Sequence, residues 1–191
     1  MASPDLTRLR ELFDRIGRVA AAEEWGEDLN PAQHGALAYL ARANRFSRAP
    51  SNVADYLCTT RGTASQTLKA LERKGFVRPV PSSEDKRRLS YNVTSKGRQA
   101  LDAPRSFDAA LGALSPAETS ALADLLEATG RRLLERQGYR TFGVCRTCRY
   151  HQRTENGLAC TLLKVPLTEA DAGELCHEHL PPRPEVKNIS A

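Results

Sequence analysis

Hydrophobic side chains recur at intervals of three and four residues over most of the first 137 positions, and this period predicts amphipathic helices. Two helix starts have clear capping signals: Asn30 and Ser115 each precede a proline, and Gln33 and Glu118 follow three positions later. From the period and these signals we expect helices over residues 4–20, 31–45, 50–58, 61–74, 94–103, 116–137 and 168–176.

The period changes after Gly75, where apolar and polar residues alternate in two short runs. Residues 76–80 and 89–93 therefore predict two strands, with a polar and basic turn between them. Because the helices before these strands have the pattern of a helix-turn-helix, we predict a winged helix-turn-helix. The expected fold class is mainly α with a small β-wing, to which helical dimerisation elements and a small C-terminal extension are added.

Charge is concentrated in the same region. The 191-residue chain has a formal net charge of +5, with 28 Lys+Arg against 23 Asp+Glu. Residues 61–98 hold ten of these bases and only three acids, a net charge of +7, so the rest of the chain is slightly acidic. Such a segment favours a polyanionic partner such as DNA. A solvated charged face is the alternative, because charge alone does not distinguish the two.

The second helix of a helix-turn-helix lies in the major groove, with its N-terminal residues at the base edges. In this chain that helix begins with small and polar side chains, and basic residues follow one turn later. Glutamine can bond adenine in two places, hydroxyls reach bases or phosphates, and basic side chains neutralise the backbone. We predict a DNA-binding surface made of Arg61, Thr63, Ser65, Gln66, Lys69 and Arg73 on the helix, and Asp85, Lys86, Arg87 and Arg88 in the wing.

Four consecutive motifs resemble those of MarR-family transcriptional regulators, and the similarity extends over residues 5–137. The motifs are Thr63–Leu68, Leu71–Val77, Glu84–Arg88 and Val93–Gly97. In this family a wing aspartate steadies an arginine that enters the minor groove, and the resemblance assigns these roles to Asp85 and Arg87. The chain departs from the pattern at Ser82, where many members have an additional aspartate.

The resemblance also implies a homodimer that binds double-stranded DNA at a pseudo-palindromic operator. In the family the first and last helices build the dimer. Here residues 6–20 and 122–134 form apolar stripes outside the basic segment. The two stripes could instead pack within one subunit. A domain of this size has a limited core to cover both, which favours the dimer.

The composition changes after Gly138, because four of the five cysteines lie beyond this point in a segment with few other core residues. Their spacing is Cys145-x2-Cys148-x11-Cys160-x15-Cys176. A Cys-x-x-Cys pair can place both sulfurs on one metal ion, and two further cysteines complete a tetrahedral zinc site. The same set can hold an iron–sulfur cluster, and we favour zinc slightly because it is the more general solution. His151 and His179 are candidate replacement ligands or neighbours of the ligands.

Other chemistry remains open for this segment. Nearby arginines suit a redox-active thiol pair or a disulfide switch, and unliganded packing is a further alternative. Four cysteines in so short a segment argue against packing alone, so a metal centre is preferred over a metal-free thiol switch. A structural metal is a sufficient explanation, whereas sensing requires a route to the DNA-binding region through residues 115–137. Cys58 is expected in the core, and His34 is expected to be structural.

These observations divide the chain into a DNA-binding and dimerisation domain (residues 1–138), a cysteine-rich module (139–180) and a disordered tail (181–191). The predicted function is sequence-specific transcription regulation, with repression favoured, under metal or redox control. The alternative is a thiol-redox or zinc-dependent enzyme that uses the C-terminal Cys/His cluster. Neither a βαβ pattern nor a His-Glu-x-x-His motif supports that alternative. No apolar run suits a membrane helix or a signal peptide, so we expect a cytoplasmic protein without membrane contact.

Overall fold

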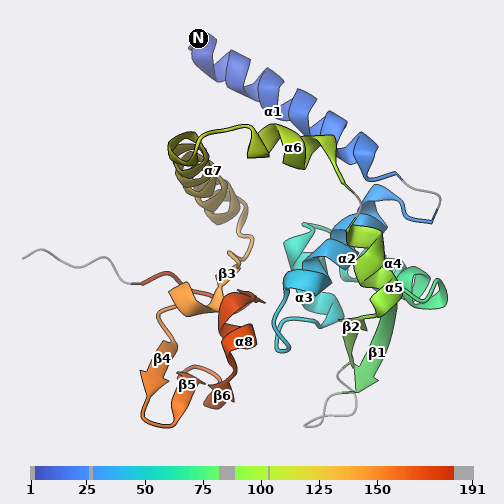
Figure 1. The fold of residues 1–191 in the computed structure, drawn as a ribbon, viewed down its shortest axis with the longest axis vertical. Coiled ribbons are helices and arrows are strands. Elements are labelled where there is room, and N and C mark those ends of the chain that lie inside the picture. Colours follow the sequence, from blue (N-terminus) through green and yellow to red (C-terminus); the bar gives the residue numbers. More distant parts are fainter. Residues whose placement is uncertain (1–2, 26–27, 82–88, 103, 183–191) are drawn as a thin grey trace, which may run out of the picture.

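The computed structural model describes residues 3–25, 28–81, 89–102 and 104–182 (Figure 1). The predicted wing residues Asp85, Lys86, Arg87 and Arg88, together with Ser82, lie outside these ranges. Residues 183–191 of the predicted tail also lie outside them.

A winged helix-turn-helix occupies the middle of the chain, as the sequence predicted. Its helices and strands are α2 (Pro31–Arg42), α3 (Pro50–Tyr56), α4 (Arg61–Arg73), β1 (Val77–Pro81), β2 (Leu89–Val93) and α5 (Ser95–Leu101). The two strands pair antiparallel, with Val77 opposite Val93. These helices and strands enclose an apolar core, whose largest fully buried side chains include Leu37, Leu40 and Leu68.

Local signals explain where these elements begin and end. The Asn30 side chain accepts a hydrogen bond from the backbone N–H of Gln33 at the start of α2, which is the predicted capping box. Gly75 follows α4 with φ +77°, a left-handed conformation that favours glycine. A Cβ on Gly97 would collide with the carbonyl oxygen of Phe76, so only glycine lets α5 pack this closely on β1.

Three helices lie away from this core: α1 (Pro4–Glu23), α6 (Ser106–Gly112) and α7 (Pro116–Gln137) (Figure 1). None of the three contains a buried residue. The sequence predicted α1 and α7 but not α6. The backbone N–H of Phe107 in α6 donates to the Glu23 carboxylate at 3.3 Å and so connects α6 to the end of α1.

The C-terminal module contains more β-structure than we expected. Its elements are β3 (Gly143–Val144), a short 3-10 turn (Cys145–Thr147), β4 (His151–Thr154), β5 (Gly157–Cys160), β6 (Val165–Leu167), α8 (Glu169–Gly173) and β7 (Leu175–Cys176). Strands β4, β5 and β6 form one antiparallel sheet, and β3 pairs with β7. The module has its own small core, which is made of Cys145, Leu158, Leu167, Ala172 and Cys176.

Two predicted helix ends were wrong. Helix α2 ends at Arg42 rather than near residue 45, because Ala43 adopts an extended conformation and pairs with Leu175. The last helix ends at Gly173 rather than at residue 176, so Cys176 lies in β7. The same strand pairing accounts for this early end, because it requires extended backbone at Leu175.

Cys58 is also not a core residue. Helix α3 ends at Tyr56, and Cys58 lies beyond it in a left-handed conformation with φ +50°. The helical period that placed its side chain inside therefore no longer applies, and the thiol is exposed. His34 is buried on α2, as expected. No helix in the described part of the chain is long and apolar enough to cross a membrane.

Candidate nucleic-acid interface and cysteine cluster

Helix α4 presents one buried and one exposed face. Ala64, Leu68 and Leu71 point into the core and fix the helix on the domain. Of the six predicted DNA-binding residues on α4, Ser65 is half-buried and the other five are exposed: Arg61, Thr63, Gln66, Lys69 and Arg73. The polar and basic residues therefore form an accessible surface on a rigid support.

The first turn of α4 is held by two threonines. Thr60 caps the helix, since its hydroxyl accepts a hydrogen bond from the backbone N–H of Thr63 at 3.1 Å. The two hydroxyl oxygens are also 2.9 Å apart. This pairing orients the Thr63 side chain at the helix end that is expected to meet the bases.

Two lysines of the positively charged segment 61–98 form hydrogen bonds within the protein. Lys74 Nζ donates to the carbonyl oxygen of Asp28 at 2.6 Å and to Gln33 Oε1 at 2.9 Å. Lys96 Nζ donates to the carbonyl oxygen of Lys74 at 2.9 Å and lies over the Phe76 ring. The net charge of the segment therefore overstates the charge that is available to a polyanion.

The four cysteines of the C-terminal module lie near one another although they come from different elements. Cys145 begins the 3-10 turn and Cys148 follows it, while Cys160 ends β5 and Cys176 ends β7. All four are free thiols. Burial, together with the nearby charges of Cys176, Cys160 and Cys148, raises the pKa of the Cys145 thiol to about 12.

Several hydrogen-bond donors point at these sulfur atoms. The backbone N–H of Leu180 donates to Cys148 Sγ at 3.4 Å, and that of Leu163 donates to Cys160 Sγ at 3.5 Å. Burial raises the pKa of the Cys176 thiol, and hydrogen bonds from the Glu178 backbone and from the side chains of Asn44 and Ser47 oppose this rise. Such donors stabilise sulfur in its charged thiolate form.

The three histidines of the module differ in their partners. His179 Nε2 is 3.0 Å from the Thr147 hydroxyl. His177 lies between Ser47, at 3.2 Å from Nδ1, and Glu178, at 3.0 Å from Nε2. His151 pairs with Cys160 across β4 and β5, and its buried Nε2 has no hydrogen-bond partner among the described residues.

The arrangement of these side chains is not that of a ready metal site. In residues 3–25, 28–81, 89–102 and 104–182, no group of three or more His, Cys, Asp or Glu side chains is placed to hold a metal ion. The metal centre inferred from the cysteine spacing therefore stays a prediction.

Comparisons with known proteins agree with this description of the DNA-binding part. Residues 27–88, from the approach to α2 to the wing, match the model of the MarR family. The match covers about a third of the chain, so the similarity to this family is shown for the winged helix-turn-helix region alone. This match agrees with the prediction of a transcription regulator. No curated protein matches the chain significantly.

Solved structures share the fold. A Staphylococcus aureus MepR–DNA complex is 21% identical, with a TM-score of 0.53, and covers 69% of this chain and 99% of its own. FabT from Streptococcus pneumoniae in complex with DNA is 24% identical, with a TM-score of 0.53, and covers 68% and 98%. The regulator BldR from Sulfolobus solfataricus is 23% identical, with a TM-score of 0.53, and covers 69% and 99%. At these identities the comparison shows the fold alone, and nearly a third of the present chain lies outside each match.

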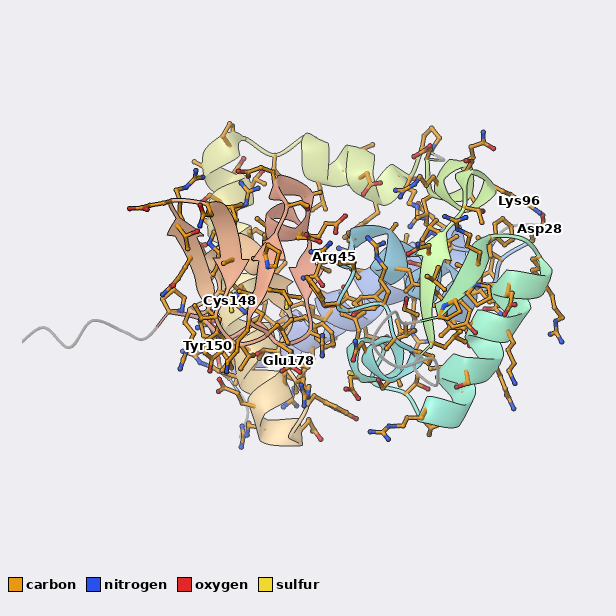
Figure 2. The ribbon with its side chains drawn as sticks, turned by 90° about the horizontal axis from the view of Figure 1, so that it is seen from below. Asp28, Arg45, Lys96, Cys148, Tyr150 and Glu178 are labelled. Carbon is orange, nitrogen blue, oxygen red and sulfur yellow. The ribbon has the colours of Figure 1, made fainter. Side chains whose placement is uncertain are left out.

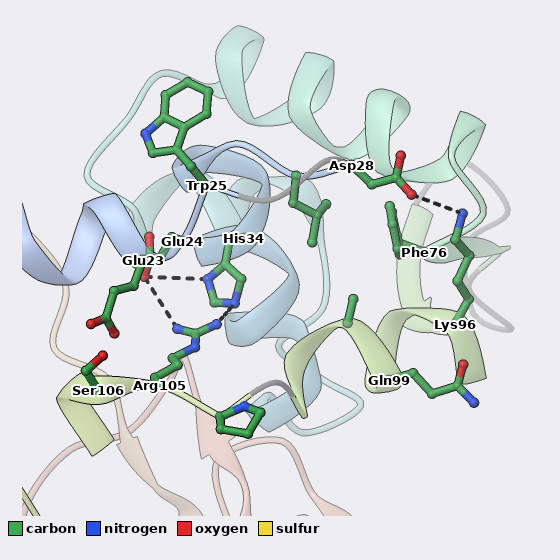
Figure 3. A pocket seen from close by; sticks show the side chains of 13 residues that line it. Glu23, Glu24, Trp25, Asp28, His34, Phe76, Lys96, Gln99, Arg105 and Ser106 are labelled. Carbon is green, nitrogen blue, oxygen red and sulfur yellow. Dashed lines mark hydrogen bonds and ion pairs between the residues drawn. The ribbon is translucent and has the colours of Figure 1, made fainter. Parts of the chain in front are cut away.

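The protein also has a pocket with charged side chains that the sequence did not predict. The pocket has a volume of about 760 Å³ and lies where the end of α1, α2, α5 and the start of α6 meet (Figure 3). Inside it Arg105 contacts His34 Nε2, and Glu24 Oε1 lies 3.5 Å from His34 Nδ1 and 3.8 Å from the Arg105 guanidinium. Burial, and then the Arg105 charge, lower the pKa of His34, while Glu24 opposes this shift. No periodic signal joins residues 34 and 105, so the sequence could not pair them.

Proposed function

We propose that the protein binds a specific, pseudo-palindromic DNA operator as a homodimer and represses transcription, under the control of a metal or redox event at its four-cysteine module. The observation that supports DNA reading is the exposed polar and basic face of α4, which includes Gln66 and Lys69. A side chain that contacts the edge of a nucleobase supplies specificity, and a basic side chain that contacts a phosphate supplies affinity. A dimer that covers its operator excludes other proteins from it, which is why we propose repression.

The uncovered helices support the homodimer. In α1, Leu9, Phe13 and Ile16 are 49%, 51% and 46% exposed, and in α7 Leu125 is 68% exposed. Large apolar faces on a soluble domain mark interaction surfaces. Because none of α1, α6 and α7 buries a residue within the subunit, a second copy is the occupant we propose for these faces.

The experiment for DNA binding is selection of bound duplexes from a random-sequence library, followed by fluorescence anisotropy on an enriched duplex. A palindromic consensus that is bound at least a hundred times more tightly than a shuffled duplex supports the proposal, since specific sites exceed non-specific DNA by about 10³ or more in many regulators. Equal affinity for both duplexes would make the protein a non-specific binder.

For the cysteine module we propose a metal ion, with zinc slightly favoured over an iron–sulfur cluster, held by Cys145, Cys148, Cys160 and Cys176. Support comes from the four neighbouring free thiols and from the N–H groups that point at sulfur. Among the described residues the buried His151 Nε2 has no hydrogen-bond partner, and His151 pairs with Cys160 across β4 and β5, so this nitrogen offers a fifth donor. A bound metal would supply folding free energy to a module with a small core.

Metal content and the absorption spectrum of anaerobically purified protein test this proposal. A colourless protein with one zinc per chain supports zinc, and visible bands support an iron–sulfur cluster. The double variant Cys145→Ser/Cys148→Ser is expected to lose the metal. Cys58→Ser is the matched control, because Cys58 is exposed and outside the module. Full metal retention in the double variant would exclude this ligand set.

A further inference from the structure

The module contacts the DNA-binding domain in two places. Phe142 packs edge-on against the rings of Tyr39 and Tyr56, and a short segment, residues 43–49, lies against β7. We call residues 43–49 the connector. The connector leaves α2 after Arg42 and enters α3 at Pro50. Its contacts run in two directions, toward the cysteine cluster and toward the wing.

Hydrogen bonds from the backbone attach the connector to β7 on both sides of Cys176. Ala43 forms a parallel bridge with Leu175, and the backbone N–H of Asn44 donates to the carbonyl oxygen of Leu175 at 2.9 Å. On the other side, the backbone N–H of His177 donates to Ser47 Oγ at 3.0 Å. The strand that contains Cys176 is therefore held directly against the connector.

Buried polar side chains reinforce this attachment beside Cys176. Asn44 and Ser47 are 1% and 0% exposed. Ser47 Oγ donates to Asn44 Oδ1 at 2.7 Å and accepts from the backbone N–H of His177, the residue that follows Cys176. Because buried polar groups need their partners, a displacement of β7 requires these two side chains to rearrange.

The connector also contributes to the core of the module. Phe46 packs against the cluster that contains Cys145 and Cys176. Arg45 lies between the module and the winged-helix core (Figure 2), where it donates to the carbonyl oxygen of Pro166 at 2.9 Å and lies 3.5 Å from the Asp171 carboxylate. Loss of the module's packing would therefore remove apolar and polar supports of the connector together.

Arg48 links the same connector to the wing. Its Nε donates to the carbonyl oxygen of Ala43 at 2.7 Å, and the guanidinium donates to Asn92 Oδ1 on β2 at 3.0 Å and to Glu174 Oε2 at 3.4 Å. The backbone N–H of Tyr91 donates to the carbonyl oxygen of Arg48 at 3.0 Å. One residue thus contacts the module and the base of the wing, two positions before α3 begins.

The contact between the module and α7 is a weaker candidate for transmitting a change in the module to the DNA-binding domain. A cavity of about 840 Å³ lies between α7 and the module and is lined by residues that include Leu134, Tyr139 and His179. Packed, hydrogen-bonded contacts transmit a change of state better than an open cavity does. This comparison favours the connector over the route through α7 that the sequence suggested.

We propose that the connector is the element through which the state of the four-cysteine module controls DNA binding, with Ser47 and Arg48 as positioning residues. The intact module holds the connector, and the connector holds α3 and the wing in one arrangement. Disruption of the module releases the connector and changes the affinity for DNA. This inference rests on the proposed function, since it needs both a DNA-binding surface and a cysteine module that changes state.

The test is a double-mutant cycle on operator affinity, with the enriched duplex as the probe. The coupling is the ratio of the Kd of Cys145→Ser/Cys148→Ser protein to that of intact protein. We expect a change of about fivefold or more, the lower end of ordinary allosteric coupling. In the background Ser47→Ala/Glu174→Gln the ratio is expected to approach one. Glu169→Gln is the matched control background, in which the ratio should stay as in the wild-type background. Glu169 is an exposed acid of the same module, and its salt bridge is to Arg153.

Hydrogen exchange of the peptide that contains Asn44 gives a second readout. Disruption of the module is expected to speed exchange of the Asn44 amide, because its partner is the Leu175 carbonyl. Cys176→Ser gives the same readout if the first double variant does not fold. A wild-type ratio near one, or an unchanged ratio in the Ser47→Ala/Glu174→Gln background, would overturn the inference. Absence of specific DNA binding would instead overturn the proposed function.

Discussion

Arg48 and Asn92 are 44 residues apart in the sequence, and their side chains are joined by a hydrogen bond of 3.0 Å. Arg48 belongs to the connector and Asn92 to β2, so this bond fixes the base of the wing to the entrance of the helix-turn-helix. The same guanidinium reaches Glu174 in the C-terminal module. A single side chain therefore connects three parts of the protein.

We expect Arg48→Lys to destabilise the fold. A lysine has one terminal nitrogen and cannot reach the carbonyl of Ala43, Asn92 and Glu174 together. Hydrogen bonds that involve a charged group contribute about 1.5–3 kcal/mol each, so a loss of about 2 kcal/mol is expected in denaturant unfolding. Arg153→Lys is the control, because its side chain is 78% exposed and is expected to change stability little. Equal stability of the two variants would show that Arg48 does not bridge the parts.

Gln66→Ala should reduce specificity more than affinity. Gln66 is exposed on α4, which we propose to lie in the major groove, and a bidentate contact to a base contributes about 1–3 kcal/mol of discrimination. Anisotropy titrations should show weaker binding of the enriched duplex and little change for a shuffled one. Gln152→Ala, at an exposed position on β4, should leave both affinities unchanged. A parallel loss on both duplexes would place Gln66 at the DNA backbone instead.

Lys69→Gln should weaken binding to enriched and shuffled duplexes alike. A lysine at a phosphate releases a counterion, so the slope of log affinity against log salt concentration should fall by about 1. Lys164→Gln removes the same charge from an exposed position in the module and serves as the control for net charge. An identical change of slope in both variants would indicate a general charge effect rather than a contact.

Leu125→Glu should break the proposed dimer. Leu125 is 68% exposed in the single chain, and a carboxylate buried at a subunit interface is costly without a partner. Sedimentation velocity should show a dimer for the wild type and a monomer for the variant, with helicity preserved. Leu163→Glu places the same charge at an exposed site in the module and should leave the dimer intact. A wild-type monomer at micromolar concentration would exclude the homodimer.

The local elements of the winged helix-turn-helix could be predicted because their signals are local. The capping box at Asn30, the glycine after α4 and the alternation around Tyr91 each depend on neighbouring residues. The exposed face of α4 followed from the same helical period. Cys58 shows the limit of that argument, because one left-handed residue after the end of α3 removes the period.

The long-range contacts could not be predicted in this way. The hydrogen bond between Ser47 and the His177 backbone joins residues 130 positions apart, and neither residue type has a pattern that indicates its partner. The strands of the module are two to four residues long, too short for alternation to be visible. The cysteine spacing led to the prediction that the four residues act together, but it gave no information about the connector against which β7 lies.

Acidification should destabilise the protein through His34. Arg105 can only donate, so the contacting Nε2 of His34 accepts and the ring is neutral in the folded state. Burial and the Arg105 charge hold the pKa of His34 below its ordinary value, against the opposing charge of Glu24. The unfolded chain therefore takes up a proton as the pH falls through about 6.5, while the folded chain does not, and the free energy of unfolding decreases below that pH. Denaturant unfolding at pH 7.5 and 5.5 should show a smaller loss on acidification in His34→Gln than in the wild type, and a larger loss in Glu24→Gln. Identical losses in all three proteins would show that His34 does not carry this pH dependence.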